Sequence, residues 1–329
     1  MKMLGRLLAH SRGCYDDLVI VHDGPIQSTP PSEEFSRRVR VKAPSKHLGP
    51  EELSLSSPAC PAPEIAKDYA RLWAHSPLPN GYRWCRGRGT PGSLLALVHC
   101  FRGRVFEGPR CFQQEPHWPF AWWAARQDWI LRLDADEFPS PELARWLRNF
   151  RTTPARSVAP VGFLAIWPLW DGHRSCTRHW PGDRLFLFRK SRANFWGMAE
   201  QGPVLDGKIE HLSLKLIHAP NRKSYGIRNI LFRRQAYRWR KIIADSITRS
   251  ARLVPRWRTK GADWPEPWRS KLRHPLLKAW ACLAWFPLCQ AKSMWRAEGK
   301  ISISACLNPA LHHFLIQIAI AKKCRELSA

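Results

Sequence analysis

The pattern of apolar and polar positions predicts strands interleaved with helices over the first two thirds of the chain. Short apolar runs bounded by polar or turn residues are typical of strands, and they cover 17–24, 104–107, 128–133, 158–166, 183–189 and 212–218. The uninterrupted run Leu18–Val21 predicts a strand buried on both faces, as in a parallel sheet covered by helices. This order of elements favours an α/β layered domain.

Helical spacing is clearest in three segments between these strands. Residues 3–10 predict a short helix, and 119–126 predict a Trp-rich one. A third helix is expected after Ser140, which suits an N-cap, with a proline and a glutamate following in the first turn. Residues 26–100 are insertion-like and poorly patterned, apart from a predicted helix over 63–74.

The chain changes character near residue 225. From there, Arg and Lys are interspersed with apolar residues, which predicts a basic amphipathic helix, and helical patterns continue to the C-terminus. We therefore predict a domain over 1–224 and a basic helical extension over 225–329. The longest apolar runs, 275–288 and 310–321, are too short to span a membrane and fit buried or interfacial helices.

Composition adds a strong charge to this picture. The chain has 53 Lys and Arg against 26 Asp and Glu, a formal net charge of +27, together with 18 Trp. This excess predicts an anionic partner, which charge alone leaves open among nucleic acid, an anionic lipid surface and a phosphorylated substrate. The ten cysteines include no CxxC pair and fit thiols in a reducing cytosol. Because the first apolar run is too interrupted for a signal peptide, we expect a cytoplasmic protein that can lie on the inner face of the plasma membrane.

The sharpest chemical motif is Asp134-Ala135-Asp136-Glu137, directly after the predicted strand over 128–133. Carboxylates two residues apart at the end of a strand are expected to point the same way, because side chains alternate with period two. Crowded acids repel one another unless a cation neutralises them, and Mg²⁺ or Mn²⁺ prefers carboxylates together with phosphate oxygens. A DxD also occurs by chance in solvated loops, but the apolar strand before it favours a metal–diphosphate site.

Three segments resemble family-2 glycosyltransferases with the GT-A fold. The stretch 128–138 resembles their DxD region, and 18–25 resembles their earlier strand, whose acidic end contacts the nucleoside. The segment 183–218 resembles their acceptor-side half, so the resemblance covers about residues 1–220 with a break at the insertion-like region. It implies a Rossmann-like mixed sheet covered by helices. The basic extension is similar to the helical tails of relatives that build envelope polysaccharides and lipopolysaccharide cores.

Carried over by position, the resemblance implies a donor site that holds Mg²⁺ or Mn²⁺ and a nucleotide sugar, with UDP expected as the nucleotide. Asp136 is the implied metal ligand, and Asp134 contacts the ribose or assists the metal. Asp23 is placed near the base or the ribose. His218 reaches the diphosphate or the metal, with a structural histidine as the alternative. Arg184 pairs with phosphate or is merely solvated.

The resemblance also implies a general base. Family members invert the anomeric centre by direct displacement, so one carboxylate must deprotonate the acceptor hydroxyl. Glu200 matches the family's acidic position after the acceptor-side strand, and Asp206 is the second candidate. The alternative interpretation of Glu200 is an exposed acid in a loop.

Two departures from the family pattern bear on the donor site. The family has an acid pair after its early strand, whereas this chain has His22 before Asp23. Relatives also place a strand before the first helix, centrally in the sheet, and this sequence begins within that helix. We therefore expect the fold without its first strand, either because the start lies upstream or because the donor pocket is damaged.

The sequence thus leads to one main hypothesis and two alternatives. The main hypothesis is a metal-dependent, inverting, hexosyltransferase-like enzyme that moves a sugar from a nucleotide-diphosphate donor to a hydroxyl of an envelope glycan or lipid-linked acceptor. The first alternative is a truncated or inactive relative. The second is a basic nucleic-acid-binding protein, which leaves the acidic motif unexplained and has no zinc spacing in its favour.

The basic extension itself has two interpretations. Basic residues beside apolar ones at helical spacing suit a helix on an anionic lipid surface. Tryptophans that suit the interface of such a surface are Trp257, Trp264, Trp268, Trp280 and Trp285. A solvated basic face, with the opposite face in the core, is the equal alternative.

Overall fold

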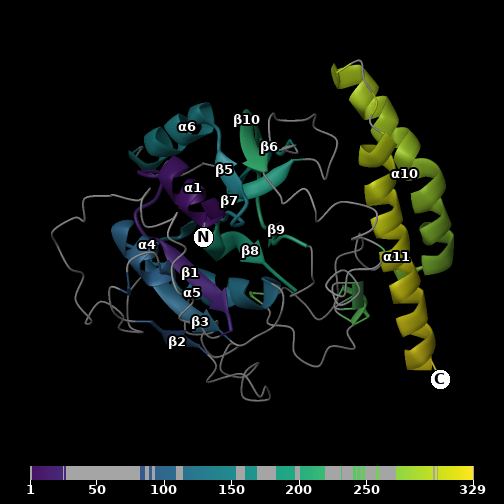
Figure 1. The fold of residues 1–329 in the computed structure, drawn as a ribbon, viewed down its shortest axis with the longest axis horizontal. Coiled ribbons are helices and arrows are strands. Elements are labelled where there is room, and N and C mark those ends of the chain that lie inside the picture. The colour runs from purple at the N-terminus through teal and green to yellow at the C-terminus, as the bar shows by residue number, and fades with distance from the viewer. Residues whose placement is uncertain are drawn as a thin grey trace.

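The computed structural model contains two sheets with helices on their faces, a two-stranded ribbon and a C-terminal helical hairpin (Figure 1). The residues that it describes are 2–24, 26, 82–85, 89–90, 93–108, 114–152, 160–168, 183–196, 201–218, 231, 240–241, 243–245, 247–248, 257–258, 272–298, 301 and 303–328. This arrangement confirms a mixed α/β architecture with parallel strand pairs and two C-terminal helices.

The first sheet has three strands in the order β1-β3-β2. Their bounds are Val19–Asp23 for β1, Arg104–Gly108 for β3 and Arg83–Trp84 for β2. β1 runs parallel to β3, whereas β2 is antiparallel to it. Two helices pack on this sheet, α4 (Leu94–Cys100) and α5 (Trp118–Ala124), with a 3₁₀ turn at Glu115–His117 ahead of α5. The helix α1 (Lys2–His10) packs through Leu7 on Phe138 and Ile217 of the second sheet.

The second sheet has five strands in the order β4-β7-β6-β10-β5. Their bounds are Trp129–Leu131 for β4, Arg184–Arg189 for β7, Gly162–Ile166 for β6, Ile209–His218 for β10 and Glu137–Pro139 for β5. Only β6 and β10 are parallel neighbours. The helix α6 (Pro141–Thr152) covers one face, and the ribbon of β8 (Ala193–Asn194) and β9 (Val204–Leu205) follows a 3₁₀ turn at Lys190–Arg192.

The core is built on both faces of β4. Ile130 packs with Trp118 and Trp122 of α5, whereas Trp129 and Leu131 pack toward the cluster that contains α6. This alternation is the period-two pattern of a strand with both faces covered. Trp257 is fully buried in the α5 cluster, edge-on to Trp122 with ring centroids 5.8 Å apart.

The C-terminal hairpin consists of α10 (Pro275–Glu298) and α11 (Ile303–Ser328), which lie to one side of the sheets (Figure 1). α11 packs through Ile316 and Ile320 against the helical residues Ile243 and Ile247. The ammonium of Lys323 pairs with Asp245 at 3.2 Å at the same junction. Among the described residues, no helix is long and apolar enough to cross a membrane.

Several predictions of local structure are confirmed, namely α1, β1, β3, α5, α6 and β7. Ser140 caps α6 as expected, because its hydroxyl accepts a hydrogen bond from the Leu143 amide at 3.2 Å. The predicted helix over 63–74 and most of the basic segment after 225 lie outside the described residues.

Two predictions about burial are wrong. The strand β1 does pair in parallel, but all five of its residues are only half-buried, because one of its edges faces a cavity. Trp257 does not serve as an exposed interface anchor, since its side chain is 0% exposed.

Candidate functional site

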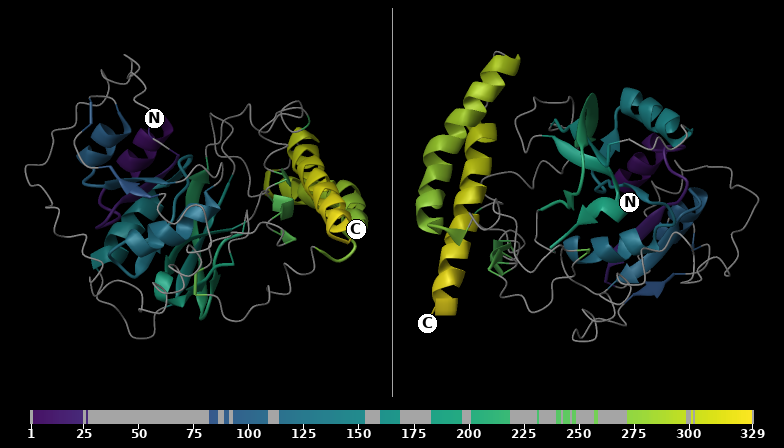
Figure 2. Two further views of the ribbon diagram at one scale, coloured as in Figure 1. Left: turned by 90° about the horizontal axis from the view of Figure 1, so that it is seen from below. Right: turned by 180° about the vertical axis from the view of Figure 1, so that it is seen from behind.

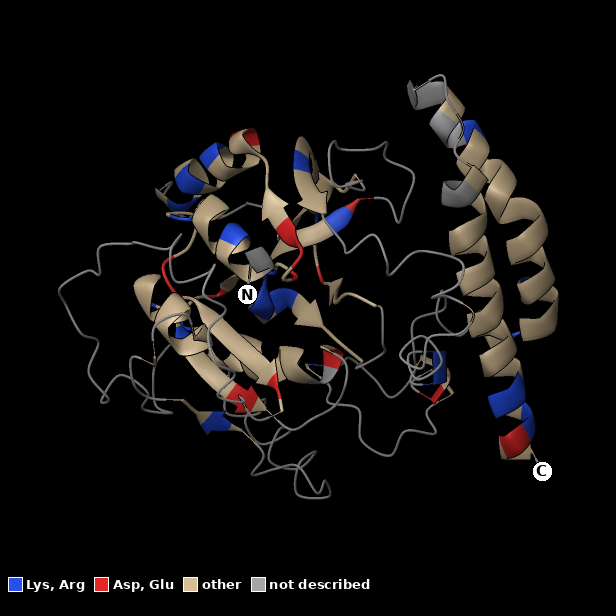
Figure 3. Ribbon diagram, viewed as in Figure 1, with Lys and Arg blue, Asp and Glu red and all other residues tan. Residues whose placement is uncertain are grey.

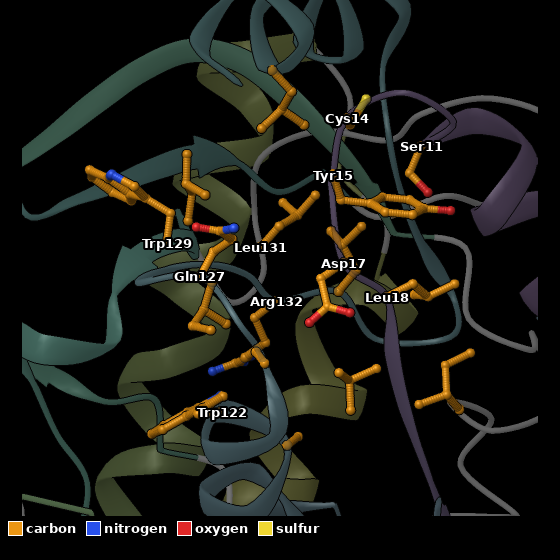
Figure 4. Close-up of a pocket in the computed structure, with 18 of the residues that line it drawn as sticks. Ser11, Cys14, Tyr15, Asp17, Leu18, Trp122, Gln127, Trp129, Leu131 and Arg132 are labelled. Carbon is orange, nitrogen blue, oxygen red and sulfur yellow. The ribbon is translucent and has the colours of Figure 1, made fainter. Parts of the chain in front are cut away.

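A cavity of about 1080 Å³ lies between the two sheets, lined by β1 on one side and β4 on the other (Figure 4). Its walls are largely apolar, with Ile20 and Val21 from β1 and Leu131 from β4. Among the described strands, β1 pairs only with β3 and β4 pairs only with β7. The backbone edges of β1 and β4 that border this cavity are therefore not joined into one sheet.

The amino ends of β1 and β4 are tied together beside this cavity. The Asp17 carboxylate accepts hydrogen bonds from the Arg126 amide at 2.9 Å and from the Arg104 guanidinium at 2.5 Å. Arg104 also donates to the Ala124 carbonyl at 2.7 Å. Because Asp23 and Asp134 both border the cavity beyond the other strand ends, β1 and β4 run in the same direction. Ligands of open α/β sheets bind at such carboxyl ends.

Asp134 belongs to a buried ion-pair cluster at the carboxyl end of β4. Its carboxylate accepts a hydrogen bond from the Arg184 guanidinium at 2.6 Å. Arg184 also lies 3.1 Å from a carboxylate oxygen of Glu137. The predicted phosphate partner Arg184 is thus held by two acids of the motif, where it compensates their charge.

Asp134 and Asp136 do not point the same way, which corrects the expectation from strand periodicity. β4 ends at Leu131, and the motif continues as a turn closed by a hydrogen bond from the Glu137 amide to the Asp134 carbonyl at 2.9 Å. Asp136 therefore faces His218 rather than Arg184, with 3.5 Å between its carboxylate and the imidazole. Period two holds only while the backbone stays extended.

His218 is a buried residue at the end of β10, where its ring stacks on Trp167 with 4.3 Å between centroids. Burial works to raise the pKa of Asp136, but the contact with His218 outweighs it and lowers that pKa below its ordinary value. The turn thus carries an ionised Asp136 beside an imidazole. Two of the three residues predicted for the metal, Asp136 and His218, thus lie side by side, brought together by pairing of β10 with β5.

Glu137 is the most deeply buried acid of the motif, with no exposed surface. Its carboxylate accepts a hydrogen bond from the Asp134 amide at 2.8 Å. Burial raises the pKa of Glu137 to about 7, the Asp134 carboxylate raises it as well, and Arg184 lowers it. The hydrogen bond from the Asp134 amide ties the Glu137 side chain to the start of the turn.

Arg132 is a site residue that the sequence did not single out. Its side chain is buried and borders the cavity immediately before the acidic turn (Figure 4). Its guanidinium lies over the Trp118 ring, 4.1 Å from the centroid. Burial and the neighbouring Arg184 lower the pKa of Arg132 to about 10, so the guanidinium is still charged at neutral pH. Within the described part of the chain, two of its nitrogens, Nε and one terminal amine, have no hydrogen-bond partner. A buried cation with open donors is suited to an anion.

Asp23 lies at the opposite side of the cavity mouth, in a chain of polar side chains. One carboxylate oxygen is 3.1 Å from the His117 ring, whose other nitrogen is 3.0 Å from the Tyr82 hydroxyl. Burial lowers the pKa of His117, although Asp23 opposes this effect. His22, which stands where the family has an acid, contacts the Gly24 carbonyl at 2.8 Å.

Of the predicted site residues, Asp23 and Asp134 line the cavity, whereas Asp136, Arg184 and His218 do not. Asp206 is exposed after β9, away from the cavity lining, and its amide donates to the Arg192 carbonyl at 2.9 Å. Glu200 lies outside the described residues. Within the described part of the chain, no three His, Cys, Asp or Glu side chains are grouped closely enough to form a metal site by themselves.

Comparisons with protein-family models, with curated proteins and with solved structures gave no match to this chain. The functional interpretation therefore rests on the sequence motifs and on the geometry of the cavity. Two residues of opposite charge, Arg132 and Asp134, line the cavity just after β4.

Proposed function

We propose that the chain is a glycosyltransferase that binds a nucleotide-diphosphate sugar at the carboxyl ends of β1 and β4. The observation that carries this proposal is the buried Arg132, which lines the cavity beside the acidic turn and has two donors without a partner in the described structure. A diphosphate supplies acceptors for those donors and a negative charge for the guanidinium. A divalent cation would bind between the phosphate oxygens of this diphosphate and the carboxylates of the turn.

The proposed cation is Mg²⁺ or Mn²⁺, held by Asp136 with help from Asp134 and His218. The donor set suits such an ion in part, because Mg²⁺ commonly takes one or two protein carboxylates and completes its shell with phosphate oxygens and water. When bound, the metal would stabilise charge on the leaving diphosphate. The Asp134 carboxylate is held in place by a hydrogen bond of 2.6 Å from the Arg184 guanidinium.

The remaining roles follow from the positions of the other residues. Asp23 is fixed by His117 at 3.1 Å and is proposed to receive the base or ribose. Glu200 and Asp206 remain the candidates for the base that takes the proton of the acceptor hydroxyl during inversion. The proposed acceptor is a hydroxyl of an envelope glycan or a lipid-linked glycan.

Calorimetric titration with UDP, and then GDP, in the presence and absence of Mn²⁺ tests this proposal. Wild-type protein is expected to bind one nucleotide in a metal-dependent manner. Asp136→Ala should remove the dependence on Mn²⁺, and Arg132→Gln should weaken binding by at least about tenfold, as expected for loss of a charged hydrogen bond. Glu210→Gln and Arg192→Gln, at exposed positions away from the cavity, are the matched controls and should bind like the wild type.

Failure of a well-folded wild type to bind either nucleotide would contradict the proposal for this chain. Equal effects of the site variants and the control variants would contradict the assignment of the site. An affinity for nucleic acid that decreases as the salt concentration rises, and that is unchanged in Asp136→Ala, would favour the basic nucleic-acid-binding alternative.

A second candidate function is that of an inactive relative whose donor site is incomplete. The observation that favours it is the cavity between β1 and β4, since strands that run in the same direction and border one cavity leave room for a further parallel strand. Val19, Val21 and Ile130 are already covered on their faces by α5, as in the interior of a sheet. A strand in this position would form the floor of the donor site.

An added strand distinguishes the two candidates. A version with a five-residue β-forming segment and a short loop fused ahead of α1 is titrated with UDP and Mn²⁺ beside the chain itself. Binding by both versions supports the active enzyme. Binding only by the extended version supports the incomplete site, and a segment of the same length made of Gly and Ser serves as control.

A further inference from the structure

The outer face of α10 carries a continuous row of exposed apolar side chains. The exposed fractions are 69% for Leu277, 65% for Trp280, 69% for Trp285 and 63% for Leu288. Ala281 and Ala284 fill the positions between them and are also exposed. We call these six residues the α10 stripe. Large apolar side chains gathered in this way mark an interaction surface rather than an ordinary protein surface.

The stripe is exposed because α10 is the outer helix of the hairpin. Its opposite side faces α11, where Ala279 is fully buried. Trp280, at the edge of the stripe, meets Phe314 of α11 with 5.8 Å between ring centroids. α11 in turn packs on the residues around Ile243, so it lies between α10 and the sheets (Figure 2). The described parts of the chain therefore leave the stripe uncovered.

Helical spacing makes the stripe a single surface. Leu277, Ala281, Ala284 and Leu288 follow one another at intervals of three or four residues, which places them along one line of the helix. Trp280 and Trp285 stand on opposite shoulders of that line. Trp295, 61% exposed, continues it, so the row extends about 27 Å from Leu277 at 1.5 Å per residue.

Charge is excluded from the stripe and concentrated around it. Lys278, which is half-buried, is the one charged residue from Leu276 to Cys289, and the helix is mostly tan, the colour of uncharged residues, in Figure 3. Basic residues lie toward the ends of the hairpin, with Lys292 beyond the stripe and Lys322 near the end of α11. Over residues 272–328 the sequence has eight Lys and Arg against two Glu.

We propose that the α10 stripe lies on the surface of an anionic lipid bilayer. An apolar face with Trp at its shoulders and basic residues at its ends matches the three zones of such a surface, namely acyl chains, interface and anionic headgroups. A second copy of the chain is the poorer occupant, because two molecules of formal net charge +27 would repel one another as the hairpins approached. The proposal is independent of the donor site.

Vesicle flotation with the full-length protein tests the proposal. The probes are vesicles of phosphatidylcholine alone and vesicles with equal parts of phosphatidylcholine and phosphatidylglycerol. The test variant is Leu277→Ser/Leu288→Ser, and the control is Val204→Ser/Ile209→Ser, which removes two exposed apolar side chains from the domain instead. Far-ultraviolet circular dichroism and thermal melting establish that each variant is folded.

The protein is expected to float with the anionic vesicles and less with the neutral ones. The stripe variant should lose at least about tenfold in partitioning, because each buried Leu contributes more than 1.4 kcal/mol to transfer from water. Equal partitioning of the stripe variant and the control would overturn the proposal. So would a dimer in sedimentation velocity that depends on Leu277 and Leu288 without any vesicle binding, since the stripe would then bind a second copy.

Discussion

The ionisation of Glu137 is coupled to folding, because its carboxyl group is fully buried. Its folded-state pKa of about 7 lies above the ordinary 4.5, so the folded protein holds this proton more tightly than the unfolded chain does. The stabilising contribution is complete below about pH 4.5 and is lost as the pH rises through about 7. The cost at higher pH is an ionised carboxylate buried beside Asp134.

The variant Glu137→Gln should remove this pH dependence, because the amide keeps the volume of the side chain and does not titrate. Relative to the wild type, its free energy of unfolding should rise by up to about 3 kcal/mol between pH 4.5 and about pH 8. Urea denaturation of both proteins at the two pH values measures the difference. If the difference in free energy of unfolding between the two proteins is the same at both pH values, Glu137 does not titrate in this range.

We expect Arg132 to lower the stability of the folded protein and to raise its affinity for the nucleotide. Its buried guanidinium has unpaired donors in the described structure, and such a group costs free energy in the folded state. Arg132→Met should therefore leave the melting temperature unchanged or raise it, while nucleotide binding falls by at least about tenfold. Calorimetry and thermal melting of the same samples measure both effects. A large loss of stability together with normal nucleotide binding would make Arg132 a structural residue.

At the scale of elements, the sequence predicted those whose signals are local. The helix α6 follows from its cap and its apolar spacing, and β7 follows from an apolar run between charged residues. β5 was missed, because its three residues become a strand only by pairing with β10, more than seventy positions along the chain. The turn that separates Asp134 from Asp136 was missed for the same reason.

The candidate site was likewise only partly predictable from sequence. The DxD motif identified the acidic turn, and the resemblance proposed Asp136 and His218 for the same metal or diphosphate, a role that stays a prediction although the two side chains lie 3.5 Å apart. Arg132 was not singled out because its importance lies in burial and in the absence of a partner, neither of which is written in neighbouring residues. The cavity depends on how two sheets face one another, which local patterns do not encode.

The cap of α6 gives a prediction at this scale. Ser140→Ala should lower the free energy of unfolding by about 1 kcal/mol, because the Leu143 amide loses its acceptor at a buried helix end. Thr152→Ala, at the exposed end of the same helix, is the control and should change stability by less than about 0.5 kcal/mol. Guanidinium denaturation compares the two, and equal effects would count against the cap.

At the scale of the whole molecule, Asp17 joins the two sheets. It pairs with Arg104 of the first sheet and accepts the Arg126 amide just before the second. Asp17→Asn should destabilise the protein by about 3 kcal/mol, because it leaves a buried guanidinium without its charge partner.

Asp16→Asn is the matched control, because the Asp16 side chain is 56% exposed and its carboxylate makes a long, exposed ion pair with the Arg151 guanidinium at 3.6 Å. Its effect should stay below about 0.5 kcal/mol. Chemical denaturation followed by far-ultraviolet circular dichroism compares both with the wild type. A small effect of Asp17→Asn would mean that other contacts hold the sheets together.

The central claim is that the acidic turn and Arg132 together bind a diphosphate. Calorimetric titration of the wild-type protein with UDP and with uridine, each with and without Mn²⁺, tests it most directly. The account predicts that UDP binds in the presence of Mn²⁺, and that uridine, which lacks the diphosphate, binds far more weakly and without regard to the metal. Equal binding of UDP and uridine, or no binding of UDP with Mn²⁺ present, would contradict it.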